Sequence, residues 1–126
     1  MSDIAKQLGI TKGALYKHYI GKQEINFRKM LTLEQYRDPK LKQLYHDYLA
    51  TGPTEYMAAI FRKLTDSDEA AMQLALEFYG PLFLLYSVYD GTSDKESVTS
   101  MLSTHVNRFI AKIESDYSKQ GIWGGS

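Results

Sequence analysis

Apolar residues recur every three or four positions near the carboxyl end of this 126-residue chain. That spacing places them on one face of an α-helix, because an α-helix has about 3.6 residues per turn. No segment of the chain alternates polar and apolar residues convincingly, as a half-buried strand would. The sequence therefore predicts an all-α fold, and its clearest helix carries Val98, Met101, Leu102, His105, Val106, Phe109, Ile110 and Ile113.

Residues that start and stop helices divide the rest of the chain. Residues 27–36 form a helical pattern that ends before Asp38 and Pro39, and the proline suits the first turn of the next helix. We expect a break at Gly52 and Pro53, and a further helical stripe follows it. Ser67 is the expected N-cap of a long apolar helix through about residue 89, and Asp94 or a neighbour begins the last helix.

The charge and cysteine counts limit the class of protein. The chain has 15 basic and 15 acidic residues, but residues 1–26 hold four lysines against two acidic residues. A basic amino end on a slightly acidic body is compatible with nucleic-acid binding. There are no cysteines, which excludes disulfides and thiolate metal sites, and no apolar run is long enough for a bilayer. We therefore expect a cytoplasmic protein without membrane association.

The amino-terminal residues predict a helix-turn-helix. Ser2 and Thr11 are suited to cap two short helices, and Gly9 between them allows a tight reversal of the chain. Small Ala5 lies where the two helices would approach each other, and Leu8, Ile10 and Leu15 would share their core. A third helix opens at Lys22 and is expected to stop after one turn, near Asn26. Such a unit can present the start of its second helix to the DNA major groove.

The stretch DIAKQLGITKGALYKHYIGKQEI, residues 3–25, resembles the DNA-binding motif of the TetR family of bacterial regulators. Residues 27–36, 76–91 and 105–114 also resemble closing helices of such regulators. The resemblance implies a helix before Ser2 and several helices between Asn26 and Phe27, so the chain is expected to lack both. The residues that match the motif are Ile4, Ala5, Gly9, Gly13, Leu15, Tyr16, His18, Tyr19 and Lys22.

The resemblance implies how the second helix would contact DNA. Lys12 would donate to a guanine, Gly13 would let the backbone approach, and the Ala14 methyl would meet a thymine methyl. Thr11 would also face the groove. The side chains that would reach phosphates are Tyr16, Lys17, His18 and Lys22. The alternative is a solvated lysine face with a surface tyrosine and a capping histidine. The implied DNA-binding residues are Thr11, Lys12, Gly13, Ala14, Tyr16, Lys17, His18 and Lys22.

Aromatic residues are concentrated after residue 44. The hydroxyl of a buried tyrosine needs a partner, so tyrosine-rich helix faces suit a cavity for an amphipathic or aromatic small-molecule effector. Gly80 and Pro81, inside an apolar helix, predict a kink that would open room for it. An ordinary core is the alternative. The predicted ligand-binding residues are Tyr45, Tyr48, Tyr56, Met57, Phe61, Phe78, Tyr79, Phe83 and Tyr86.

The last two helices are apolar around much of their circumference, so each must bury more than one face. The resemblance implies that they pair with a second copy in a four-helix bundle, which would hold two heads about 34 Å apart on a palindromic operator. A monomer is the alternative. The predicted interface residues are Leu82, Leu85, Tyr89, Val98, Leu102, Val106, Phe109 and Ile113.

The sequence predicts a regulator and not an enzyme. His18, His46 and His105 are scattered, and no nucleotide-binding, zinc-protease or nucleophile-elbow motif is present. We expect no metal and no cofactor. The predicted domains are residues 1–26 for DNA binding, 27–120 for ligand binding and dimerisation, and 121–126 as a flexible tail. The alternative function is a helical ligand-binding or protein-interaction domain that does not bind DNA.

Overall fold

The computed structural model describes residues 6, 13, 17 and 21–118, and within them every regular element is a helix. The predicted all-α fold is confirmed for this part of the chain. The elements, in order, are α2 (Lys22–Glu34), α3 (Pro39–Tyr45), the π-helical turn η1 (His46–Ala50), α4 (Thr51–Phe61), α5 (Asp68–Gly91) and α6 (Lys95–Ser118).

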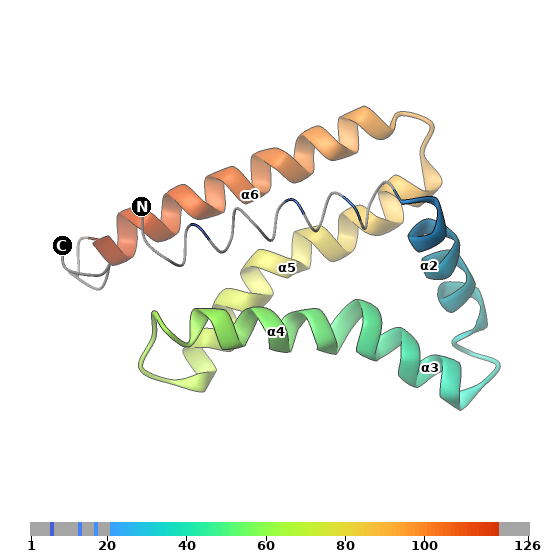
Figure 1. The fold of residues 1–126 in the computed structure, drawn as a ribbon, viewed down its shortest axis with the longest axis horizontal. Coiled ribbons are helices and arrows are strands. Elements are labelled where there is room, and N and C mark those ends of the chain that lie inside the picture. Colours follow the sequence, from blue (N-terminus) through green and yellow to red (C-terminus); the bar gives the residue numbers. More distant parts are fainter. Residues whose placement is uncertain (1–5, 7–12, 14–16, 18–20, 119–126) are drawn as a thin grey trace.

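Helix α5 is the centre of the fold, with α4 packed along one side and α6 along another, and α2 lies near the end where α5 turns into α6 (Figure 1). The core consists of the inward faces of these helices. Its completely buried members are Phe61, Ala75, Phe78, Leu82, Leu102 and Val106. The ring of Phe78 lies 6.1 Å from Phe61 and 5.1 Å from Phe109, measured between centroids. These contacts join α4, α5 and α6 in one apolar cluster.

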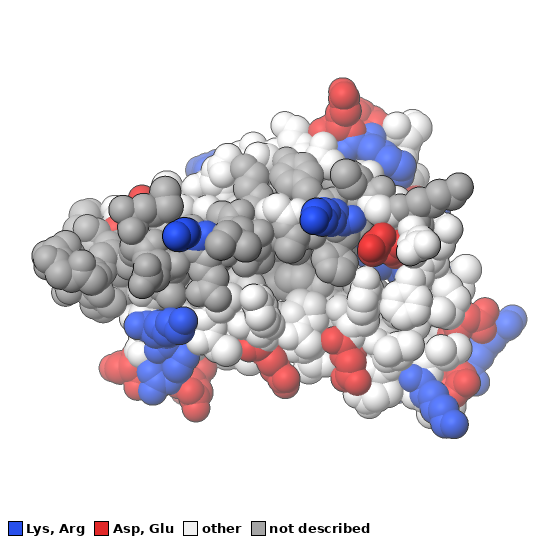
Figure 2. All heavy atoms as spheres, viewed as in Figure 1, with Lys and Arg blue, Asp and Glu red and all other residues white. Residues whose placement is uncertain are grey.

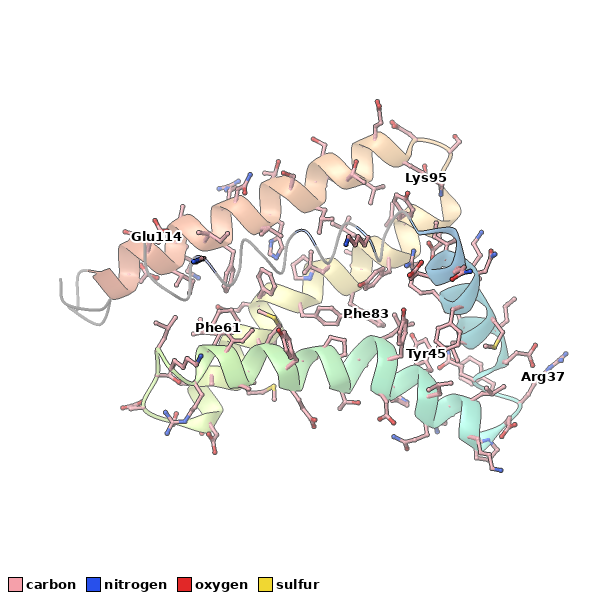
Figure 3. All side chains as sticks on the ribbon, viewed as in Figure 1. Arg37, Tyr45, Phe61, Phe83, Lys95 and Glu114 are labelled. Carbon is pink, nitrogen blue, oxygen red and sulfur yellow. The ribbon has the colours of Figure 1, made fainter. Side chains whose placement is uncertain are left out.

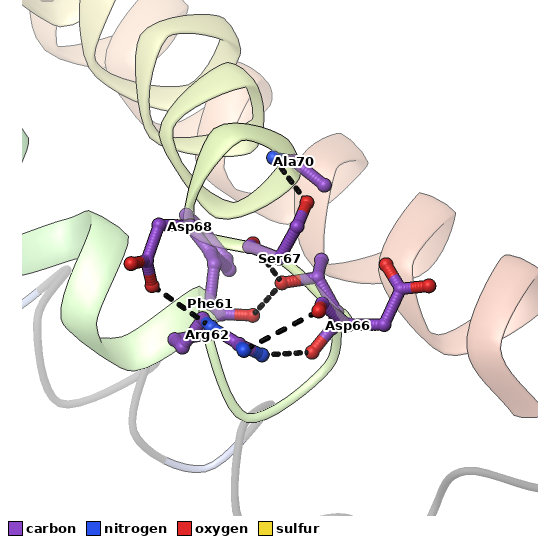
Figure 4. Close-up of polar contacts among 7 residues, drawn as sticks. Phe61, Arg62, Asp66, Ser67, Asp68 and Ala70 are labelled. Atoms are coloured by element: carbon purple, nitrogen blue, oxygen red, sulfur yellow. Dashed lines mark hydrogen bonds and ion pairs between the residues drawn. The ribbon is translucent and has the colours of Figure 1, made fainter.

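The expected helix starts are confirmed by their capping bonds. The Ser67 hydroxyl accepts a hydrogen bond of 3.1 Å from the Ala70 amide, and Asp38 accepts one of 2.9 Å from the Lys40 amide ahead of the Pro39 turn. In the loop before α5, the guanidinium of Arg62 donates to the carbonyl oxygens of Thr65 and Asp66 and to the Asp68 carboxylate (Figure 4). The two capping bonds satisfy main-chain amides that a helix start leaves without partners, and the bonds of Arg62 hold the loop between α4 and α5.

The expected end of the third helix near Asn26 is wrong. Helix α2 runs without a break from Lys22 to Glu34. Its inward side consists of half-buried Ile25 and buried Arg28 and Leu31, three residues apart. Arg28 lies on that inward side although it is charged. It therefore interrupts the apolar spacing of Ile25 and Leu31 in the sequence, but the helix continues through it.

The expected break at Gly52 and Pro53 lies two residues earlier and contains no loop. Ala50 departs from helical dihedral angles, with φ −118° and ψ −80°, and α4 begins directly after it at Thr51. Pro53 lies in the first turn of α4. A proline is tolerated there because the first amides of a helix have no partner within the helix, so the missing amide hydrogen is not needed. Glycine is required at position 52, since a Cβ there would lie 2.0 Å from the Asp47 carbonyl oxygen.

Helix α5 has the length and apolar composition of a membrane span, and it is the one described helix that does. Its buried residues nonetheless face the protein core, from Ala71 and Ala75 to Tyr89.

Helix α5 continues through Pro81 to Gly91. Its last turn is joined to α6 by Lys95, whose ammonium donates a 2.6 Å hydrogen bond to the Tyr89 carbonyl and lies 4.3 Å from the centre of the Tyr89 ring.

Candidate functional site

A pocket of about 490 Å³ lies where α2, α3, η1 and α5 meet. Its walls combine apolar and aromatic side chains with two cationic groups and one carboxylate. Figure 3 shows Tyr45 and Phe83, from α3 and α5, near this meeting point, and Phe61 near the other end of α4. The volume is in the range of pockets that hold small organic ligands. The charged and aromatic side chains of its lining are those of Arg28, Lys29, Tyr45, Phe83, Tyr86 and Asp90.

An ion pair between Arg28 and Asp90 forms part of the pocket wall. Arg28 Nη2 lies 2.5 Å from Asp90 Oδ1, and Nε donates to Asp90 Oδ2 at 3.1 Å. The side chain of Arg28 is 2% exposed and that of Asp90 15%. Two parallel bonds of this kind fix both position and orientation of the two groups. The pair therefore ties α2 to the last turn of α5, across 62 residues of sequence.

The ring of Tyr86 packs against the same guanidinium, whose Cζ lies 4.7 Å from the ring centroid. Burial raises the pKa of the Tyr86 hydroxyl to about 12, although the nearby charge of Arg28 acts in the opposite direction. Tyr86 is therefore neutral at physiological pH. A neutral ring can accept the cation on its face without competing with Asp90 for the bidentate contact.

A chain of tyrosines continues from the pocket into the core. The rings of Tyr86 and Tyr79 lie edge-on with centroids 6.5 Å apart, and the Tyr79 hydroxyl donates to the Leu49 carbonyl at 2.6 Å. Tyr48 lies edge-on to Phe27, with ring centroids 5.0 Å apart. Burial also raises the pKa of Tyr48, with a smaller contribution from the charge of Glu24. These contacts hold α2, η1 and α5 together beside the pocket.

The predicted ligand-binding residues do not form one group. Tyr45, Phe83 and Tyr86 line the pocket, and Tyr48 and Tyr79 support it. The remaining residues lie elsewhere: Met57, Phe61 and Phe78 are buried in the main core, and Tyr56 is 58% exposed on α4.

The charged residues of the pocket were missed by sequence reasoning. Neither Arg28 nor Asp90 was among the predicted ligand-binding residues. A charged residue spaced three positions from Ile25 and Leu31, on the inward side of α2, was the available signal. The partner of such a residue lies 62 positions away, which no local pattern reveals.

The eight predicted interface residues are all buried inside the single protomer, with exposures from 0% to 9%. They face the core that α5 and α6 share with α4. The outward sides of the same helices also carry apolar residues, and these form a spaced stripe on α5. The outward apolar residues are Leu76, Leu84 and Val88 on α5 and Met101 on α6.

Few of the predicted DNA-binding residues lie in the described part of the chain. Gly13 and Lys17 are exposed, and nothing lies within 4 Å of where a Cβ at Gly13 would be. Lys22 is the first residue of α2, after the N-cap Gly21. The other five lie outside the described residues, as do the predicted tail and the expected cap at Ser2: Thr11, Lys12, Ala14, Tyr16 and His18.

Charge on the described surface is mixed. On the face drawn in Figure 2, basic and acidic side chains are interspersed and form no single basic area. Arg62 and Asp68 form an exposed ion pair, with Nε 2.9 Å from Oδ1. A second groove of about 580 Å³ follows α6, and its described lining comes from that helix alone.

Comparison with known proteins gives one match. Residues 1–27 match the family model described as "Bacterial regulatory proteins, tetR family". The matched residues include the described Lys6, Gly13 and Lys17 and extend into the first turns of α2. No curated protein and no solved structure matches the chain. The match supports a helix-turn-helix at the amino end.

Proposed function

We propose that this chain, a TetR-type DNA-binding transcriptional regulator by the match of its residues 1–27, is a repressor that releases a palindromic operator when a small molecule binds its carboxyl-terminal part. The family match is the single observation that carries the proposal. Residues 1–26 serve as the DNA-binding head, residues 27–120 as the regulatory and dimerisation domain, and residues 121–126 as a tail. The protein acts in the cytoplasm, where the operator is.

The position of the pocket supports a link between effector and head. The matched residues end at position 27, and the next residue is Arg28, which lines the pocket. Helix α2 contains both the end of the matched segment and this arginine. An effector in the pocket therefore contacts α2 itself, the helix that connects the DNA-binding head to the rest of the chain. It can change the orientation of α2 against α5 directly.

The regulation follows from a difference in affinity. A ligand shifts an equilibrium between two conformations only to the extent that it binds one of them better. The effector binds best when α2 has moved away from its DNA-bound position, and binding of effector and of operator then oppose each other reciprocally. Occupation of the pocket releases the operator.

The dimer is formed by the outward sides of α5 and α6. The inward sides of α5 and α6 are buried in the protomer core. A second copy therefore packs against the exposed apolar residues Leu76, Leu84, Val88 and Met101. Gly80 lies on this side of α5 as well, four residues from both Leu76 and Leu84, and it is exposed. Small residues at such a position let two helices approach closely.

DNA binding is tested by selecting duplexes from a random pool with the purified full chain and measuring affinity for the selected duplex by fluorescence anisotropy. We expect a palindromic sequence and a steep loss of affinity with rising salt. Lys17→Ala and Lys22→Ala should weaken binding, whereas Lys63→Ala, an exposed lysine after α4, should not. A pool that yields no sequence above background would refute the repressor and favour a domain without DNA-binding activity.

A further inference from the structure

The pocket has the chemistry of an anion-binding site with apolar walls. Its charged residues are two cations, Arg28 and Lys29, and one carboxylate, Asp90. Tyr45, Leu49 and Phe83 add apolar and aromatic surface. A ligand that fits this combination has a hydrophobic body and one negatively charged group. Arginine is the side chain best suited to bind a planar carboxylate through two parallel hydrogen bonds.

Asp90 already accepts the two parallel hydrogen bonds that the Arg28 guanidinium can donate. Its location on α5 is nevertheless unfavourable for a carboxylate. It lies in the last turn of the helix, one residue before the final Gly91. Unpaired carbonyl groups make the carboxyl end of a helix electronegative, and a negative side chain there is destabilising. Asp90 is also the more exposed partner of the pair, at 15% against 2% for Arg28. A carboxylate that is not attached to this helix end can therefore compete with it.

We propose that the pocket binds an amphipathic carboxylic acid, whose carboxylate replaces Asp90 on Arg28. The hydrophobic body of the acid lies against Phe83, Tyr45 and Leu49. Asp90 then turns outward to solvent, and the tie between α2 and α5 is lost. Arg28 follows the ligand, so that α2 is no longer held to the last turn of α5. Binding of the acid concerns the pocket alone. Only the expected release of DNA after binding rests on the proposed function.

Binding is tested without DNA, by isothermal titration calorimetry of the full chain. The probes are 1-naphthaleneacetate, 4-phenylbutyrate and decanoate, each compared with its own primary amide, which has nearly the same shape and no charge. We expect at least one acid to bind about ten-fold more tightly than its amide, which corresponds to the loss of one charge-assisted contact. Equal affinities for all three pairs, or no binding by any acid, would overturn the proposal.

Substitutions then distinguish the role of Arg28, which binds the carboxylate of the acid, from that of Asp90, which competes with it. Arg28→Gln and Arg28→Lys should both weaken binding of the acid, because lysine keeps the charge but loses the two-pronged contact. Asp90→Asn should strengthen binding of the acid by about ten-fold and leave the amide unchanged, because it removes the competing carboxylate. A gain of affinity cannot arise from a misfolded variant. Unchanged or weakened acid binding by Asp90→Asn would overturn the proposal.

Matched controls use another arginine–aspartate ion pair, that of Arg62 and Asp68. Arg62→Gln and Asp68→Asn make the same chemical changes in an exposed pair outside the pocket, and both should leave acid binding unchanged. Failure of the proposed function has a different signature: the acid would bind with the expected dependence on Arg28 and Asp90, while affinity for the selected duplex stayed the same with and without the acid.

Discussion

The hydroxyl group of Tyr79 on α5 donates a 2.6 Å hydrogen bond to the main-chain carbonyl oxygen of Leu49 in η1. In a regular α-helix the amide of residue 53 would bond to that carbonyl, but residue 53 is proline and has no amide hydrogen. The tyrosine hydroxyl thus supplies a donor in place of the amide that residue 53 lacks. One side chain from the central helix therefore stabilises the irregular turn that connects α3 to α4.

We expect Tyr79→Phe to lower the free energy of unfolding by about 1–3 kcal/mol, since it leaves a buried carbonyl without this donor. Chemical denaturation followed by circular dichroism measures the change. Tyr36→Phe removes the same hydroxyl from a tyrosine that is 86% exposed and should be neutral. Equal effects of the two substitutions would show that the bond to Leu49 contributes nothing specific.

Two glycines in helices should respond to alanine in opposite directions. Gly52→Ala places a Cβ 2.0 Å from the Asp47 carbonyl oxygen, so the backbone must shift, and we expect a loss of stability of about 1–3 kcal/mol. Within one protomer, Gly80→Ala meets nothing within 4 Å. At concentrations where the protein is monomeric it should therefore stabilise α5 by about 0.5–1 kcal/mol, because alanine has less conformational freedom to lose. Thermal unfolding of both variants beside the parent protein tests the pair. A stabilising Gly52→Ala would contradict the close contact.

The stability of the protein should fall at high pH partly through Tyr86. Burial raises the pKa of its hydroxyl in the folded state to about 12, from an ordinary value of 10.0. Because the folded pKa is the higher one, the contribution to stability is complete below pH 10 and is lost as pH rises towards 12. We expect Tyr86→Phe to lose less stability than the parent over this interval.

Denaturation curves between pH 9 and 12 measure this difference, with Tyr36→Phe as the control. Absorbance at the phenolate band gives an independent readout, because the last tyrosine to ionise should be missing in Tyr86→Phe. A parallel decline of stability in the parent and in Tyr86→Phe would argue that another group is responsible.

Inward and outward residues of the last two helices should affect different properties. Leu102 is completely buried, so Leu102→Ala should lower the free energy of unfolding by about 2–5 kcal/mol. Leu84 is 63% exposed, and Leu84→Ser should change protomer stability by less than about 0.5 kcal/mol while weakening self-association. Sedimentation velocity over a range of concentrations tests the second expectation. A monomeric parent protein would remove the basis for the proposed dimer.

Several features of the fold were predictable because their signals are local. The caps at Asp38 and Ser67, the proline in the first turn of α3 and the apolar period of α6 all depend on residues within a few positions of one another. The amino-terminal motif is equally local, and its resemblance agrees with the family match of residues 1–27. The helical class of the protein follows from these patterns without knowledge of packing.

The candidate site was less predictable, because it depends on which helix faces meet. Phe61 and Phe83 are both aromatic residues on apolar helices, yet one is completely buried in the main core and the other lines the pocket. The residues with the clearest apolar spacing, such as Leu102 and Val106, proved to face the protomer core. Periodicity identifies a face that must be buried, but it does not identify what covers that face.

The sequence by itself determined that this chain is helical, where most of its helices begin, and that its amino end carries a DNA-binding motif, since each of these depends on neighbours along the chain. Only the tertiary structure decided that α2 continues past Asn26 and that Arg28 meets Asp90. The physical reason is that a charged side chain is buried only when a partner compensates its charge, and that partner is brought into place by the packing of distant helices.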